Sequence, residues 1–128
     1  MEQAYLADPW RASAVAEAAV ERAAQELRQV LVALATSLDP FPGFQGLKTL
    51  QAVEVDLGSM EDPGRGCVVV GPDGLLYELV LHTIHGPLEY GDADQVEELK
   101  ELELAPHEYV QYAYRAIQQL AEIKRGLK

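Results

Sequence analysis

Two apolar runs joined by a four-residue turn constrain the fold of this chain more than any other feature. The runs span Cys67 to Ile84 and flank Gly71-Pro72-Asp73-Gly74. Pro72 fixes the φ angle that the second position of a type I turn requires, and Gly74 can adopt the left-handed conformation that closes a hairpin through a bulge. The sequence therefore predicts an antiparallel hairpin, which the other segments extend or cover.

The second strand of this hairpin carries apolar residues on both of its faces. One face holds Tyr77, Leu79 and Leu81, and the other holds Leu76, Val80 and Ile84 together with Glu78 and His82. A strand with one wet face should instead alternate apolar and polar residues. We therefore expect the second face to contact another layer, either a helix of the same chain or a partner subunit.

A long helix is predicted before the hairpin, from Asp8-Pro9 to Leu38, with Asp8 as its N-cap. Its apolar residues recur three or four positions apart and form a heptad seam of Ala16, Val20, Ala24, Leu27, Leu31, Leu34 and Leu38. Such a helix is about 45 Å long, whereas a domain of this size has a radius of gyration of about 14 Å. Either the helix overhangs and pairs with a second copy of itself, or it runs diagonally across the sheet.

The segment after this helix, residues 39–46, is rich in proline and glycine and predicts a turn. Its two aromatic residues, Phe41 and Phe44, either plug the end of the core or form an exposed recognition loop. Tyr114 falls on the polar side of the last predicted helix, where a tyrosine is either an isolated exposed aromatic or part of an interface. These three residues are the predicted partner-binding residues.

The remaining elements complete a single α+β domain over residues 1–128. Residues 50–57 alternate as a half-buried first strand, and Asp92-Ala-Asp-Gln95 fits a capping box that opens a short acidic helix to about Glu103. A last helix is predicted from about His107 to Arg125. The predicted fold has a long N-terminal helix, a three-stranded antiparallel sheet containing the hairpin, and two C-terminal helices.

The net charge of −11 limits the partners that such a chain can bind. A strongly acidic surface repels phosphate backbones and anionic lipids, so binding to nucleic acid or to membranes is not expected. No apolar run approaches the length of a membrane span, the first ten residues lack the features of a signal peptide, and Cys67 is the single cysteine. These features predict a cytoplasmic protein.

Histidines at positions 82, 85 and 107 are the candidates for a metal site, with Glu78 nearby. Histidines and carboxylates are ligands for zinc or iron. However, residues three apart on a strand point to opposite faces, so His82 and His85 could converge only if the chain turned at Ile84. We therefore predict no cofactor and no catalytic residue, and we keep a small-molecule or metal-binding enzyme with a site around Glu78, His82, His85 and His107 as the alternative.

The order of a helix, three antiparallel strands and a C-terminal helix resembles the layout of YbaB-type nucleoid-associated proteins, and a small acidic dimer resembles type III secretion chaperones. The first resemblance implies DNA binding, which the net charge disfavours. The second family normally continues with further strands where this chain has its predicted acidic helix. The function we predict is that of a non-enzymatic intracellular protein, a homodimeric protein-binding or chaperone-like module.

Overall fold

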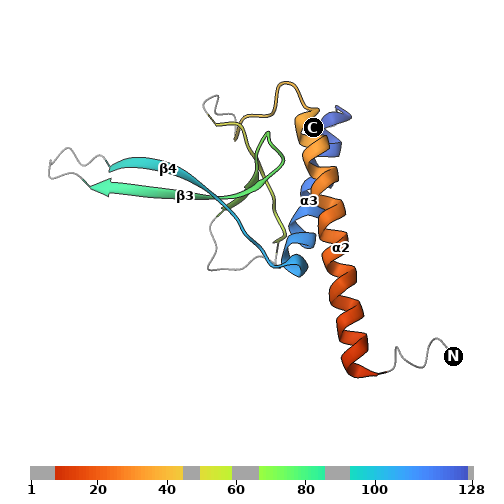
Figure 1. The fold of residues 1–128 in the computed structure, drawn as a ribbon. Coiled ribbons are helices and arrows are strands. Elements are labelled where there is room, and N and C mark those ends of the chain that lie inside the picture. The colour runs from red at the N-terminus through yellow and green to blue at the C-terminus, as the bar shows by residue number, and fades with distance from the viewer. Residues whose placement is uncertain (1–7, 45–49, 59–66, 86–92, 127–128) are drawn as a thin grey trace.

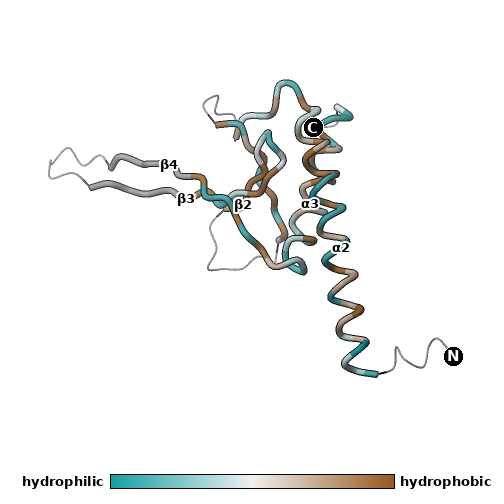
Figure 2. The backbone as a smooth tube through the Cα atoms, in the orientation of Figure 1, coloured by the Kyte–Doolittle hydropathy of each residue, from teal (hydrophilic) through white to brown (hydrophobic). Residues whose placement is uncertain are grey.

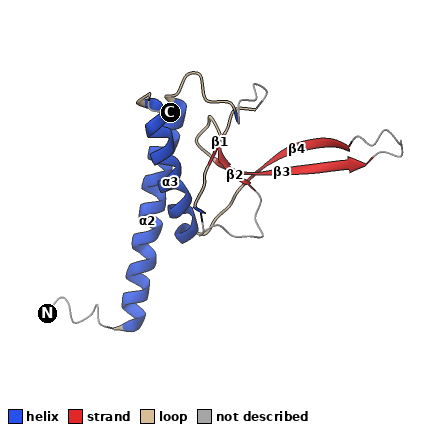
Figure 3. Cartoon of the chain, turned by 180° about the vertical axis from the view of Figure 1, so that it is seen from behind, coloured by secondary structure: helices blue, strands red, loops and turns tan. Residues whose placement is uncertain are grey.

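The computed structural model describes residues 8–44, 50–58, 67–85 and 93–126, with the backbone alone for 80–85 and 93–98 (Figure 1). The described elements follow the order α2 (Pro9–Thr36), β1 (Val53–Glu54), β2 (Cys67–Val70), β3 (Leu76–His85), β4 (Ala93–Glu101) and α3 (Pro106–Lys124). Both helices lie on one side of the sheet, while the outer parts of β3 and β4 project away from them (Figures 1 and 3). The predicted α+β class and the long N-terminal helix are confirmed.

The four strands form one antiparallel sheet in the order β1-β2-β3-β4. The predicted hairpin is the pair β2 and β3, in which Cys67 lies opposite Leu79 and Val70 lies opposite Leu76. β1 adds to β2 with Val53 opposite Val70, and β4 pairs with β3 from Tyr77 opposite Glu101 to His85 opposite Ala93.

The prediction of three strands followed by two helices was wrong in one segment. Residues 93–101 form strand β4 where the capping box and the spacing of Val96, Leu99 and Leu102 had indicated an acidic helix. Those signals are local, whereas β3 is ten residues long and offers a full edge of backbone groups for pairing. The long-range ladder therefore outweighs the helix propensity of the glutamates.

The predicted start of α2 is confirmed. The Asp8 side chain accepts a hydrogen bond from the backbone N–H of Trp10 over 3.0 Å, and Pro9 occupies the first turn, where its missing N–H has no cost. The helix ends at Thr36, two residues before the predicted end, and the Ser37 hydroxyl donates to the carbonyl of Leu34. Among the described residues, neither helix combines the length and apolar character that a membrane span requires.

α2 and α3 run in the same direction. Lys124, in the last turn of α3, donates a hydrogen bond to the carbonyl of Ser37 at the end of α2, and the first residues of α3 lie beside the stretch of α2 around Val20. Between these ends, Leu31 and Leu120 are fully buried. The Arg28 guanidinium lies 4.6 Å from the centre of the Tyr109 ring, a cation–π contact that links the two helices.

The sheet buries apolar side chains on both faces. Val68, Val70 and Leu76 belong to the core that also contains the helix residues, and Figure 2 shows hydrophobic residues gathered where α2, α3 and β2 meet. On the other face, Val69 and Leu79 pack with Phe44 and Ala52. The second face of β3, the face of Leu76, therefore contacts the helices of the same chain at that residue, which is one of the two predicted alternatives, and the side chains of Val80, His82 and Ile84 lie outside the described residues.

The turn between β2 and β3 is the point at which the sheet meets α2. Gly74 has a φ angle of 83°, as the predicted bulge requires, and its N–H donates to the carbonyl of Gly71. A Cβ atom at Gly74 would lie 2.5 Å from the Cα atom of Val32, so only glycine allows the turn to approach the helix backbone this closely.

A hydrogen bond across this turn joins the Tyr77 hydroxyl to Asp73 Oδ2 over 2.5 Å. This bond, together with burial and the nearby carboxylate charges, raises the pKa of Tyr77 from 10.0 to about 12. Because the folded protein favours the neutral phenol, the stabilising contribution is complete below pH 10 and is lost as the pH rises through about 12.

Replacing Gly74 with alanine is expected to lower the free energy of unfolding by roughly 3 kcal/mol, because a left-handed alanine costs about 1–2 kcal/mol and the overlap with Val32 adds to it. Gly58→Ala is the matched control: its φ is 66° and no atom lies within 4 Å of the added Cβ. Urea denaturation of both variants measures the difference. Equal losses would contradict the close contact between the turn and α2.

Candidate functional site

The predicted metal site depends on a turn that the backbone does not make. β3 continues through Ile84 to His85, and its pairing with β4 is unbroken over that length. The side chains of His82 and His85 lie outside the described residues, so the metal alternative stays a prediction. Among the side chains that are described, no group of three histidine, cysteine, aspartate or glutamate residues could hold a metal ion.

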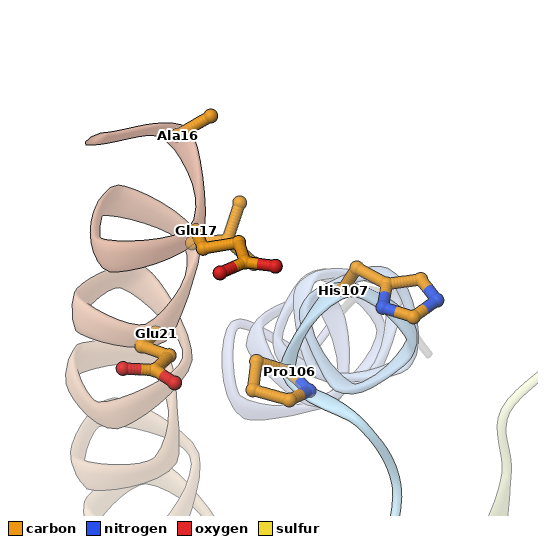
Figure 4. A pocket seen from close by; sticks show the side chains of 6 residues that line it. Ala16, Glu17, Glu21, Pro106 and His107 are labelled. Carbon is orange, nitrogen blue, oxygen red and sulfur yellow. The ribbon is translucent and has the colours of Figure 1, made fainter. Parts of the chain in front are cut away.

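His107 lies at the start of α3, on the body of the molecule, and is exposed. It lines a groove between α3 and α2 that also contains Glu17 and Glu21. In Figure 4, the Glu17 side chain extends across the gap towards α3, whereas the His107 ring points away from α2. The imidazole and the carboxylate therefore do not converge as an acid–base pair would.

Phe41 and Phe44 are both buried, and they lie on opposite sides of the sheet. Phe41 joins the main core beneath the helices, and Phe44 covers the other face beside Val69 and Leu79. Only 5% of Phe41 and 8% of Phe44 is exposed. The structure therefore places them as core residues, the first of the two roles considered for this segment, and gives neither a surface that a partner could contact.

Tyr114 lies on the outer side of α3 and is 58% exposed. Its hydroxyl accepts a hydrogen bond from Gln118 Nε2 over 3.3 Å, one turn further along the helix. The neighbouring positions Tyr112 and Ala113 are buried, so the core is filled without Tyr114. Of the three predicted partner-binding residues, Tyr114 is the one whose side chain is available for contact.

The apolar seam of α2 extends beyond the part of the molecule that covers it. Ala24 and Leu31 are buried, but Val20 is half-buried and Ala16 is exposed. Residues 9–15, which we call the overhang, precede the part of α2 that lies beside α3, and they project past the body in Figure 1. The overhang carries Trp10, which is 86% exposed.

A groove marks the point where the seam loses its cover. Its volume is about 330 Å³, and it is lined by Ala16, Glu17, Val20, Glu21, Pro106 and His107. Ala16, Val20 and Pro106 supply apolar surface, and the two glutamates supply carboxylates (Figure 4). This volume is at the lower end of the range for ligand pockets, about 300–1,000 Å³.

The sequence indicated that α2 is long enough to overhang, but it did not indicate the groove. The groove needs the start of α3 to lie beside Ala16–Glu21, about 90 positions away in the chain. The one signal in the sequence was the mismatch between the predicted helix length and the size of the domain. Trp10 is the single tryptophan of the chain, and no motif or spacing in the sequence marks it as a contact residue.

Comparison with known proteins finds no relative of this chain. No family model, no curated protein and no solved structure matches the chain.

Phe41→Ala is expected to lower the free energy of unfolding by about 3–5 kcal/mol, because it removes a buried ring from the main core. Tyr114→Ala removes an aromatic ring of similar size from an exposed position, so a change within about 0.5 kcal/mol is expected. Chemical denaturation of the two variants provides the comparison. If Phe41→Ala left the free energy of unfolding unchanged, this ring would not be part of the core.

Proposed function

We propose that this chain acts as a non-enzymatic, intracellular protein-binding or chaperone-like module that works as a homodimer. The observation that carries the proposal is the seam of α2, which is buried at Ala24 and Leu31 but open at Ala16. Apolar helix faces are stable when another element covers them. A second copy of the chain would supply that cover.

The shape of the described chain supports the same proposal. The overhang of α2 and the projecting parts of β3 and β4 both extend away from the core (Figure 3). Association with another subunit would bury part of the surface that these segments expose.

The distribution of charge favours α2 as the surface where two copies meet. α2 carries three arginines and three glutamates and is formally neutral: Arg11, Arg22, Arg28, Glu17, Glu21 and Glu26. In contrast, residues 76–103 contain one lysine and eight acidic residues: Lys100, Glu78, Glu89, Asp92, Asp94, Glu97, Glu98, Glu101 and Glu103. Two copies of a chain with a net charge of −11 repel each other least where the surface is neutral.

Protein binding fits the described surface better than catalysis does. The open surfaces identified above are the seam of α2, the groove and Tyr114 on α3, and their apolar and aromatic character is typical of protein interfaces. Tyr114 lies outside the seam, so it would remain available to a partner in a dimer formed through α2. The dimer would thus present two copies of the α3 surface.

Light scattering on a size-exclusion column tests this proposal, run with and without added zinc and with the metal content measured on the same peak. We expect a mass twice the 14.1 kDa of the chain, without bound metal. A monomer would contradict the homodimer. A monomer that holds zinc in a one-to-one ratio would favour the alternative, a metal site around Glu78, His82, His85 and His107.

A further inference from the structure

The groove at the end of the seam has the chemical character of a site for an indole ring. Ala16, Val20 and Pro106 offer apolar surface, and Glu17 and Glu21 offer acceptors for an N–H donor. Tryptophan combines a large apolar ring with one donor, and when buried it pairs that donor with an acceptor. The single tryptophan of the chain, Trp10, lies outside this groove and is 86% exposed.

We propose that Trp10 of one copy binds in the groove of a second copy. The two overhangs lie antiparallel about a two-fold axis, so that each tryptophan reaches the groove formed by Ala16, Val20 and Pro106 of the other subunit. This inference rests on the homodimer proposed above and assigns its interface.

The spacing along α2 supports a two-fold arrangement. A two-fold interface requires one surface to carry both the inserted group and its receptor. Trp10 lies one heptad before Glu17, about 10 Å along the helix, so the inserted ring and this wall of the groove lie on the same face of α2. If two copies of α2 lie antiparallel and the two-fold axis passes near Ala14, each Trp10 lies beside residue 18 of the other copy, next to the groove.

The antiparallel register also keeps like charges apart. With the two-fold axis near Ala14, Arg11 of one copy lies at the same level along the helix axis as Glu17 of the other, on a different side of the helix. Glu17 extends into the gap beside α3 (Figure 4). A parallel pair would instead bring identical charges side by side, which disfavours it.

The area of the proposed contact is compatible with a stable dimer. Two buried tryptophans contribute about 300–500 Å², and a specific interface buries about 1,200–2,000 Å² in total. The remainder would come from the overhang faces and from the first turn of α3, which carries Pro106 and His107. Tryptophan is also the residue type most enriched among those that dominate binding energy.

Tryptophan fluorescence tests the inference in the full chain, because Trp10 is the only tryptophan. As the protein concentration rises through the dissociation constant of the dimer, we expect the emission to shift to shorter wavelength and quenching by iodide to fall. Trp10→Ala is expected to raise the dissociation constant at least about 30-fold, measured by light scattering and sedimentation, with helix content checked by circular dichroism.

Two further variants distinguish the groove from the rest of the overhang. Ala16→Arg places a charge in the groove at an exposed helix position and should weaken the dimer as strongly as Trp10→Ala. Val15→Arg is the matched control, because it adds the same charge one residue earlier, about 100° around the helix, and Val15 does not line the groove. We expect it to change the dissociation constant less than about threefold.

The possible failures of this inference can be told apart. A wild-type monomer at all concentrations would contradict the proposed homodimer and the inference with it. A wild-type dimer in which Trp10 stays accessible to iodide, or which Trp10→Ala leaves intact, would contradict the inference alone. Protection of Trp10 that does not depend on concentration would mean that the same chain, and not a second copy, covers Trp10. Equal effects of Val15→Arg and Ala16→Arg on the dissociation constant would exclude a role specific to the groove.

Discussion

The buried contact between α2 and α3 determines how the rest of this molecule is arranged. Leu31 of α2 and Leu120 of α3 are fully buried in the same core, and the Lys124 ammonium links the C-terminal ends of the two helices by donating to the Ser37 carbonyl. The two helices are parallel and end at the same level at their C-terminal ends. Their difference in length therefore appears entirely at their N-terminal ends. α2 has 28 residues and α3 has 19, so the N-terminal part of α2 has no helix beside it.

The sheet is attached to the two helices by two kinds of interaction, one with α2 and one with α3. The turn at Gly74 approaches the backbone of Val32, which sets the distance between the hairpin and α2. α3 reaches the other edge, where Gln119 donates to the carbonyl of Glu54 over 2.8 Å and Arg115 donates to that of Asp56 over 3.3 Å. A two-residue strand such as β1 makes few ladder bonds of its own, so these side chains help to hold it in place.

The features that the sequence predicted correctly are those with local causes. The N-cap at Asp8, the turn at Gly74 and the start of the last helix, predicted at about His107 and found at Pro106, each follow from the conformational preferences of a few adjacent residues. β4 was missed because its conformation comes from pairing with β3, and that pairing leaves no mark in the spacing of its own residues. The groove was missed for a similar reason, since Val20 and Pro106 meet only in the folded chain.

Hydrogen exchange along α2 at low and high protein concentration tests most directly whether a second copy covers the open part of the seam. A helix end without tertiary contacts opens with a free energy near zero, so its amides exchange rapidly, whereas the buried part around Leu31 is protected. If a second copy covers the seam, exchange is slow around Leu31 at both concentrations, and exchange of residues 12–20 slows when the protein is concentrated. Rapid exchange of residues 12–20 at every concentration would contradict coverage by a second copy.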